Sequence, residues 1–166
     1  MKKRQRAVLV ALALVGVAGC APAKNVFGDP KAGYVGDVAA RAAAADWSSA
    51  ETLTVALSEF AFSPDRLTFQ EGAPYRLSIE NGGERAHSFV SEGFFKAIAA
   101  RKLTTPSGAV EHPYLKSIAF PPGEAKELHF VAVKPGTYEL ECTVPLHATF
   151  GMTGKIRIER EAPATR

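Results

Sequence analysis

Three side chains that bind soft metal ions lie at even spacing near the end of the chain. Cys142, His147 and Met152 are each five residues apart, in the segment CTVPLHATFGM. A thiolate and a thioether favour copper over harder ions, and an imidazole binds both copper oxidation states. A cysteine, two histidines and a weak axial methionine form an electron-transfer copper centre, so one further imidazole is needed. Among the other histidines, His87 follows a strand-like run, within the phrase NGGERAHSF.

The segments on either side of this loop show the alternation of half-buried strands. Tyr138, Leu140 and Cys142 alternate with two glutamates, which places Cys142 on the core side where the strand ends. Ile156 and Ile158 alternate with charged residues directly after the loop. The three candidate ligands therefore lie in one loop that joins two strands.

The phrase NGGERAHSF, followed downstream by YELECTVPLHATFGMTGKIRI, resembles the cupredoxins, the small blue-copper proteins. The resemblance covers about residues 52–159, and the loop spacing is most similar to the rusticyanin type. It implies a trigonal set of His87, Cys142 and His147, with Met152 as the axial ligand. Together they would hold one copper ion that alternates between Cu(I) and Cu(II). Leu146 stands where this family usually has a glycine.

Short strands separated by turns account for most of the chain beyond residue 50. Apolar and polar residues alternate at 53–57, and Ser63-Pro64-Asp65 marks a turn before the next short strand. This cadence is typical of an antiparallel sandwich or barrel, and the resemblance implies an all-β, Greek-key, cupredoxin-like fold. We predict one cupredoxin domain at 51–160 and a C-terminal tail at 161–166. Later strands are expected at about 125–133, 137–142 and 154–159.

The segment between His87 and the later strands has a different character. The sequence GFFKAIAARK at 93–102 predicts a short amphipathic helix, and Pro106 and Gly108 mark a loop after it. We interpret 91–117 as an elaboration whose helix packs beside the sandwich. Its apolar residues are expected in the core, and an exposed partner surface is the alternative.

The first twenty residues have the pattern of an export signal. Four basic residues precede an uncharged apolar run at 7–18 that is too short to span a bilayer comfortably. The sequence Val17-Ala18-Gly19-Cys20 resembles the bacterial lipobox, which implies a signal peptide at 1–19 and a lipid anchor on Cys20. An ordinary secreted protein cut nearby and an uncleaved anchor are the alternatives. Residues 20–50 would then form a tether, with a short and weakly packed helix within 37–47.

Composition limits the classes of function. A chain of 166 residues, 46% of them hydrophobic, can bury one full core. Removing the four basic residues of the signal takes the formal charge from +3 to −1, so the basic balance is no argument for nucleic-acid binding. If Cys20 carries lipid, Cys142 is the remaining thiol, which excludes an intramolecular disulfide and leaves a metal-binding or reactive role.

Neighbours of the ligands indicate how the site is tuned and where partners bind. In cupredoxins a polar residue after the first histidine hydrogen-bonds to the cysteine loop, which implies a contact between Ser88 and Thr143. Two solvated hydroxyls are the alternative. The resemblance also implies that electrons pass through the edge of His147 near solvent, so that redox proteins such as cytochromes or an oxidase dock there. The surrounding apolar residues, which could also plug the barrel end, are Val144, Pro145, Leu146 and Phe150.

The remaining histidines are weaker candidates. His129 alternates with Leu128 and Phe130 and is expected at the surface. His112 lies in the inserted segment and could approach the metal from there.

Our leading hypothesis is a lipid-anchored type 1 copper protein that carries single electrons on the periplasmic side of a bacterial cell envelope. We expect no enzyme, because nothing in the sequence resembles the second, histidine-rich copper centre of oxidases and nitrite reductases. Copper sequestration or delivery to an oxidase would use the same ligands, but the chain lacks methionine-rich tracts. A nucleophilic pair of Cys142 and His147 fits the spacing less well than metal binding. A binuclear copper centre would need a second cysteine in the loop.

Overall fold

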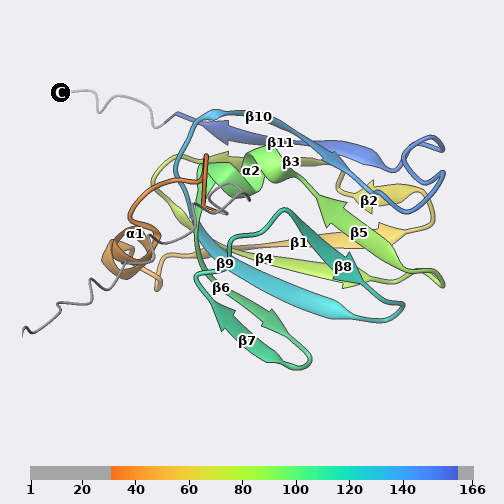
Figure 1. Cartoon of the computed structure of the whole chain (residues 1–166), viewed down its shortest axis with the longest axis horizontal. Helices are drawn as coiled ribbons and strands as arrows, with labels where there is room; N and C mark the ends of the chain where they lie inside the picture. Colours follow the sequence, from red (N-terminus) through yellow and green to blue (C-terminus); the bar gives the residue numbers. More distant parts are fainter. Residues whose placement is uncertain (1–30, 161–166) are drawn as a thin grey trace, which may run out of the picture.

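Two β-sheets packed face to face form the body of the protein in the computed structural model, which describes residues 31–160 (Figure 1). One sheet has the strand order β2-β1-β4-β9-β6-β7 and the other the order β3-β11-β10-β5-β8. The strands are β1 (Glu51–Ser58), β2 (Ala61–Ser63), β3 (Arg66–Gln70), β4 (Pro74–Asn81), β5 (His87–Val90), β6 (Ile98–Thr105), β7 (Gly108–Glu111), β8 (Ser117–Phe120), β9 (Ala125–Ala132), β10 (Gly136–Glu141) and β11 (Thr153–Glu159). The helices are α1 (Val38–Ala44) and α2 (Glu92–Ala97).

The predicted all-β sandwich is confirmed, and its sheets are mixed. Most neighbouring strands are antiparallel, whereas β1 pairs with β4 and β3 pairs with β11 in parallel. Both parallel pairs bring an N-terminal strand beside a strand from later in the chain. The three later strands were predicted close to their observed bounds, because β10 and β11 alternate apolar and polar residues and turn residues separate all three.

Alternating apolar side chains fill the space between the two sheets. The aromatic rings of Phe69, Phe94 and Phe130 pack against one another, with centroids 5.1–5.6 Å apart. Phe69 belongs to β3 and Phe130 to β9, so the cluster joins the two sheets. Phe94 comes from α2, and both Phe94 and Phe95 are buried. The prediction that the apolar residues of 91–117 lie in the core is therefore confirmed for the helix and for β6, whereas Val110 and Tyr114 are exposed.

The predicted helix at 93–102 is wrong in its second half. Helix α2 ends at Ala97, and the chain continues as β6, which pairs with β9 and carries β7 on its other edge. Ile98 and Ala100 contribute to the main core, while Ala99 packs with the cluster on the outer face of the sheet. Since both faces of β6 are covered here, the sequence has no alternation and resembles a helix of alanines. The pairing with β9 outweighs that local preference.

The predicted short helix within 37–47 is present as α1, but the described part of the predicted tether packs on the domain. Helix α1 packs on the outer face of β6 and β9, where Val35 and Val38 form a small core with Ala99 and Val131. The backbone carbonyl of Trp47 accepts a hydrogen bond of 3.2 Å from Arg76 on β4. The packed domain therefore begins well before residue 51. Ala42 is the buried alanine of α1, and the other alanines of this helix are exposed.

Several predictions concern residues outside the described part of the chain. The signal peptide at 1–19, Cys20 and the tail at 161–166 all lie there. Within residues 31–160, no helix is both long enough and apolar enough to cross a membrane.

Candidate metal centre

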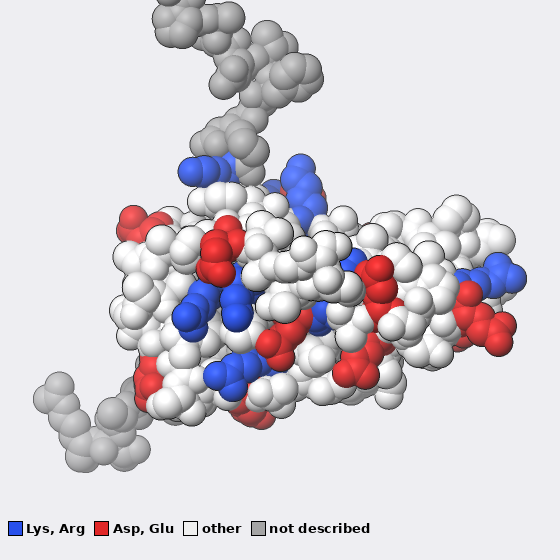
Figure 2. Space-filling model, turned by 90° about the horizontal axis from the view of Figure 1, so that it is seen from below, with Lys and Arg blue, Asp and Glu red and all other residues white. Residues whose placement is uncertain are grey.

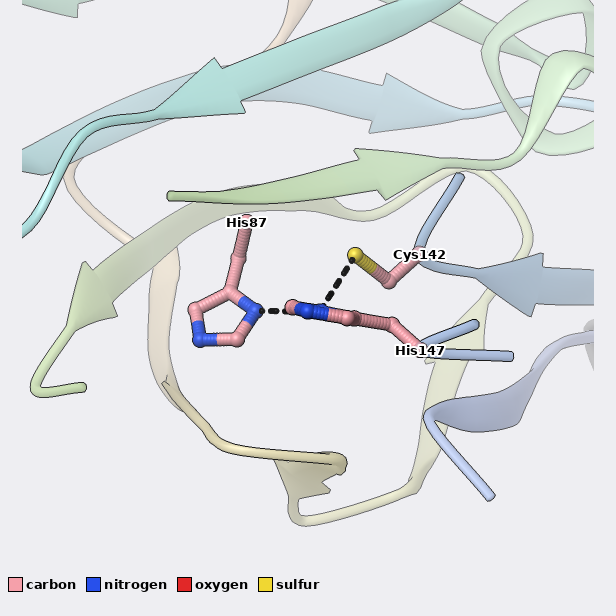
Figure 3. A group of neighbouring side chains, drawn as sticks. All are labelled: His87, Cys142 and His147. Carbon is pink, nitrogen blue, oxygen red and sulfur yellow. Dashed lines mark hydrogen bonds between the residues drawn. The ribbon is translucent and has the colours of Figure 1, made fainter. Parts of the chain in front are cut away.

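Three predicted ligands meet at one end of the sandwich (Figure 3). His87 is the first residue of β5, Cys142 directly follows β10, and these two strands are hydrogen-bonded neighbours. His147 lies in the loop between β10 and β11. The Nδ1 atoms of His87 and His147 are 3.2 Å apart, and Nδ1 of His147 is 3.6 Å from Sγ of Cys142. All three side chains are buried.

The loop from 142 to 152 is folded by its own backbone hydrogen bonds. The N–H of Cys142 donates to the carbonyl of Met152 at 3.1 Å, and the N–H of Met152 donates to the carbonyl of His147 at 2.9 Å. These bonds bring the backbone of Met152, whose side chain is fully buried, next to Cys142 and His147. Leu146 has a φ of 70°, in the left-handed region where glycine is favoured. The family usually has a glycine at this position, and the left-handed conformation explains that preference. In this chain a leucine adopts the same conformation.

The spacing of the donor atoms fits one metal ion. Taking the zinc values for a first-row ion, about 2.0 Å to nitrogen and about 2.3 Å to sulfur, donors at trigonal or tetrahedral angles lie about 3.3–3.7 Å apart. The observed separations of 3.2 and 3.6 Å are within about 0.1 Å of this range. Burial, followed by repulsion from His147, lowers the pKa of His87 against the attraction of Glu59, which favours the neutral ring that binds metals.

The chemistry of the donors selects the metal. Imidazole, thiolate and thioether groups together suit copper and exclude hard ions such as magnesium. The arrangement of His87, Cys142, His147 and Met152 is consistent with a single type 1 copper site.

The predicted contact between Ser88 and the cysteine loop is present. Oγ of Ser88 accepts a hydrogen bond of 2.9 Å from the N–H of Thr143 and lies 3.1 Å from its hydroxyl. The N–H and Oγ of Ser88 approach Sγ of Cys142 at 3.4 and 3.6 Å. One serine therefore links β5 to the loop and surrounds the sulfur with donors.

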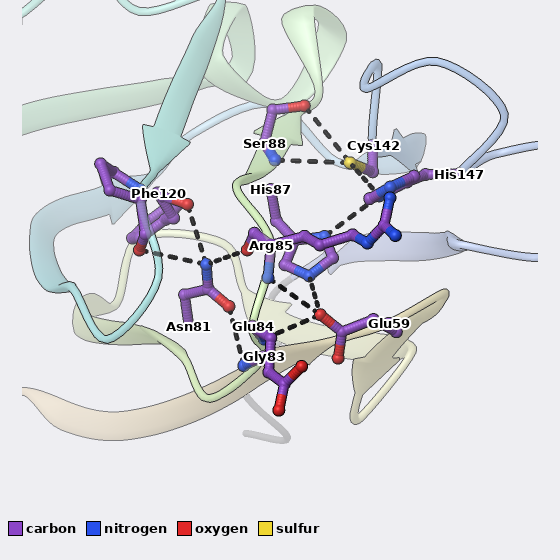
Figure 4. A network of polar contacts seen from close by, with 11 residues as sticks. Glu59, Asn81, Gly83, Glu84, Arg85, His87, Ser88, Phe120, Cys142 and His147 are labelled. Carbon is purple, nitrogen blue, oxygen red and sulfur yellow. Dashed lines mark hydrogen bonds and ion pairs between the residues drawn. The ribbon is translucent and has the colours of Figure 1, made fainter.

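A polar network that sequence reasoning missed supports the segment before His87 (Figure 4). The buried amide of Asn81 donates to the carbonyls of Arg85 at 2.8 Å and Phe120 at 2.9 Å. On the other side, Oε1 of Glu59 accepts hydrogen bonds from the N–H groups of Glu84 at 2.8 Å and Arg85 at 3.1 Å. The phrase NGG was a turn signal that could have pointed to Asn81. Glu59 is remote in sequence and gave no such signal.

The apolar face around His147 differs in part from the prediction. Leu146 and Phe150 are 64% and 60% exposed, as a docking face requires. His147 itself is only 3% exposed, because the ring of Phe60 packs edge-on against it with centroids 5.2 Å apart. Val144 packs against the core. The residues therefore both plug the end of the sandwich and leave an apolar surface, to which Phe60 adds.

The two other histidines lie outside the group of ligands. His129 was predicted at the surface, but it is only 7% exposed because Trp47 covers it, with ring centroids 5.8 Å apart. Its Nε2 contacts the carboxylate of Glu127. His112 was a candidate to approach the metal, yet its Nδ1 lies 3.4 Å from the carbonyl of Ala100 on β6, apart from the three converging ligands.

Comparison with known proteins identifies one family and several solved structures. The family model of the cupredoxin-like domain matches residues 35–157. A multi-copper oxidase from Pediococcus acidilactici has a TM-score of 0.56 at 16% identity, over 74% of this chain and 29% of that chain. A multicopper oxidase from Campylobacter jejuni has a TM-score of 0.50 at 14% identity, over 67% and 30%. Auracyanin from Roseiflexus castenholzii has a TM-score of 0.47 at 21% identity, over 69% and 98%.

These likenesses concern the fold. This chain spans about 30% of the length of the oxidase from Campylobacter jejuni. A comparison of the sequence with curated proteins finds no match.

Proposed function

The chain belongs to the cupredoxin-like domain family, and we propose that it carries single electrons between redox partners through one copper ion. The observation that carries this proposal is the convergence of His87, Cys142 and His147, whose facing atoms lie within 4.8 Å of one another. The family and this donor set together support copper rather than another metal. The closer similarity to the rusticyanin type stays a prediction.

The rigidity of the ligands supports electron transfer. A centre that transfers electrons fast must change oxidation state with little movement of its ligands, and Cu(I) and Cu(II) favour different geometries. Here His87 is held by β5 and by the network of Asn81, while Cys142 and Met152 are tied by backbone hydrogen bonds. Such a site would resist rearrangement when an electron arrives or leaves.

The alternative of copper sequestration or delivery is less well supported. Delivery requires a metal that a partner can reach, whereas His87 and His147 are 1% and 3% exposed and Cys142 is fully buried. An oxidase would need a second copper centre for its substrate. Within residues 31–160, a single group of histidine, cysteine and acidic side chains has the arrangement of a metal site.

We further propose that the protein acts in the bacterial cell envelope, lipid-anchored at Cys20, with partners docking on the apolar face. This rests on the signal-like residues 1–19 and on the exposed Leu146 and Phe150. Charged side chains of both signs are interspersed over the face shown in Figure 2, which does not favour a polyanion such as nucleic acid. Mass spectrometry of the mature N-terminus tests the anchor, and an unmodified Cys20 would exclude it.

Visible absorption of the copper-loaded protein tests the function. We expect an intense band from charge transfer between thiolate and copper, together with reversible one-electron reduction. The substitutions Cys142→Ala and His87→Asn should abolish or strongly alter the band. The matched control is His112→Asn, because residue 112 has a φ of 47°, which asparagine tolerates, and should keep it. The proposal would be contradicted if the wild-type protein lacked the band, or if the Cys142→Ala variant kept it.

A further inference from the structure

The far side of the His87 ring has an unusual environment. Nε2 of His87 is buried and has no hydrogen-bond partner within the described part of the chain. Its nearest charged neighbour is Oε1 of Glu59, at 3.7 Å, while Nδ1 on the opposite side of the ring faces His147 (Figure 4). A ring that binds metal through Nδ1 carries its proton on Nε2. That proton would therefore point to Glu59.

Glu59 is held in place by the segment that leads into β5. Its Oε1 accepts hydrogen bonds from two successive backbone N–H groups, those of Glu84 and Arg85. Backbone hydrogen bonds, from its own N–H first and then from these two, also lower the pKa of Glu59 against partial desolvation. The charge is fixed in position, unlike that of a free surface glutamate.

Gly83 makes this close approach possible. A Cβ atom at residue 83 would lie 2.6 Å from Oε1 of Glu59, closer than atoms of real side chains come. A glycine is needed here for the carboxylate to reach the backbone before β5. Glu59 lies in the turn between β1 and β2, and the next residue, Phe60, covers His147. The same turn therefore contacts both histidine ligands.

We propose that Glu59 is a positioning residue for the copper site, whose carboxylate accepts a hydrogen bond from the Nε2–H of His87 and favours Cu(II) over Cu(I). Metal-binding histidines usually donate their other N–H to a carboxylate or a carbonyl, which fixes the tautomer and raises the basicity of the ligand. The separation of 3.7 Å is longer than a hydrogen bond, so the proposal requires it to shorten when copper binds. The inference rests on the proposed function.

The first test compares two glutamine variants in the copper-loaded protein. Glu59→Gln removes the charge but keeps an oxygen that can accept the backbone hydrogen bonds. Glu84→Gln is the matched control, because it removes the same charge from a neighbouring exposed side chain that points away from His87 in Figure 4. We expect Glu59→Gln to weaken Cu(II) binding about tenfold more than Cu(I) binding, which raises the reduction potential by about 59 mV. Glu84→Gln should change the potential much less.

The second test follows the Nε2 proton itself by nuclear magnetic resonance of the diamagnetic Cu(I) protein. We expect a slowly exchanging Nε2–H signal of His87 in the wild type and faster exchange in Glu59→Ala. Equal potential shifts in the two glutamine variants, or an unchanged exchange rate in Glu59→Ala, would overturn the inference. In these outcomes the wild-type protein still shows the intense thiolate-to-copper band. If the proposed function is wrong, the wild-type protein lacks that band. Thermal unfolding of each variant identifies any loss of folding.

Discussion

The hydroxyl of Ser88 should raise the reduction potential of the copper. It lies 3.6 Å from Sγ of Cys142 and also accepts the N–H of Thr143 at 2.9 Å. A hydrogen bond to the sulfur withdraws negative charge that Cu(II) needs more than Cu(I) does. Hydrogen bonding around the cysteine sulfur is one of the factors that tune such sites. The substitution Ser88→Ala should therefore lower the potential.

The size of the effect follows from the two contacts that are lost. The hydrogen bond to the exposed Thr143 N–H contributes about 0.5–1.5 kcal/mol to stability, because water replaces it only in part. The N–H of Ser88 still approaches the sulfur at 3.4 Å after the substitution, so the change at the sulfur is partial. If the hydrogen bond to the sulfur stabilises the Cu(I) form by about 0.5–1 kcal/mol more than the Cu(II) form, Ser88→Ala lowers the potential by about 20–40 mV.

Voltammetry of the copper protein measures the potential, and chemical unfolding of the copper-free protein measures the stability. The control is Thr143→Ala, which removes a hydroxyl that contacts Oγ of Ser88 but leaves the contact between Ser88 and the sulfur. It should shift the potential less than half as much. A rise in potential after Ser88→Ala, or equal shifts in the two variants, would refute the reasoning. A loss of stability at unchanged potential would limit Ser88 to a structural role.

Two further predictions concern the copper loop and the stability of the fold. Leu146 has a φ of 70°, which only glycine adopts without strain. The free energy of unfolding of Leu146→Gly should therefore be about 1 kcal/mol higher than that of Leu146→Ala. Denaturant unfolding of the two copper-free variants checks this, and an alanine variant of equal stability would contradict it. At a free copper concentration of about 100 times the dissociation constant, binding stabilises the fold by about 2.7 kcal/mol. Removing the copper should therefore lower the melting temperature by about 10 °C. Calorimetry with and without copper measures the shift, and in Cys142→Ser the melting temperature should not respond to copper.

The metal site could be predicted from the sequence because its information is mostly local. Cys142, His147 and Met152 lie in one loop, and the strands on both sides alternate clearly. The remaining ligand, His87, is distant in sequence and was assigned through the family resemblance. The pairing of β5 with β10 explains why the four belong together. Ser88 follows from the same pairing, since it places the residue after His87 beside the sulfur.

The strand β6 could not be predicted because both of its faces are packed against other parts of the protein, so its sequence is apolar on both faces. A strand with one face in water alternates, but Ile98 and Ala100 face the main core while Ala99 faces α1. The same coverage by the N-terminal segment buries His129 under Trp47. Both errors have one cause. The segment before residue 51 was interpreted as a tether. Without that segment to cover it, the outer face of the sheet is predicted to be exposed to solvent.

Glu59 was missed for a related reason, and it shows where local patterns stop being informative. A single acidic residue in a turn is ordinary, and its role depends on a backbone approach that Gly83 permits from 24 residues away. The signal was on the side of the glycine, in the phrase NGGERAH that also contains the ligand. Glycine permits a turn and also a close approach of another group to the backbone, as Gly83 does for Glu59. The sequence could therefore mark this backbone as open to a neighbour, whereas Glu59 could be identified only in the three-dimensional structure.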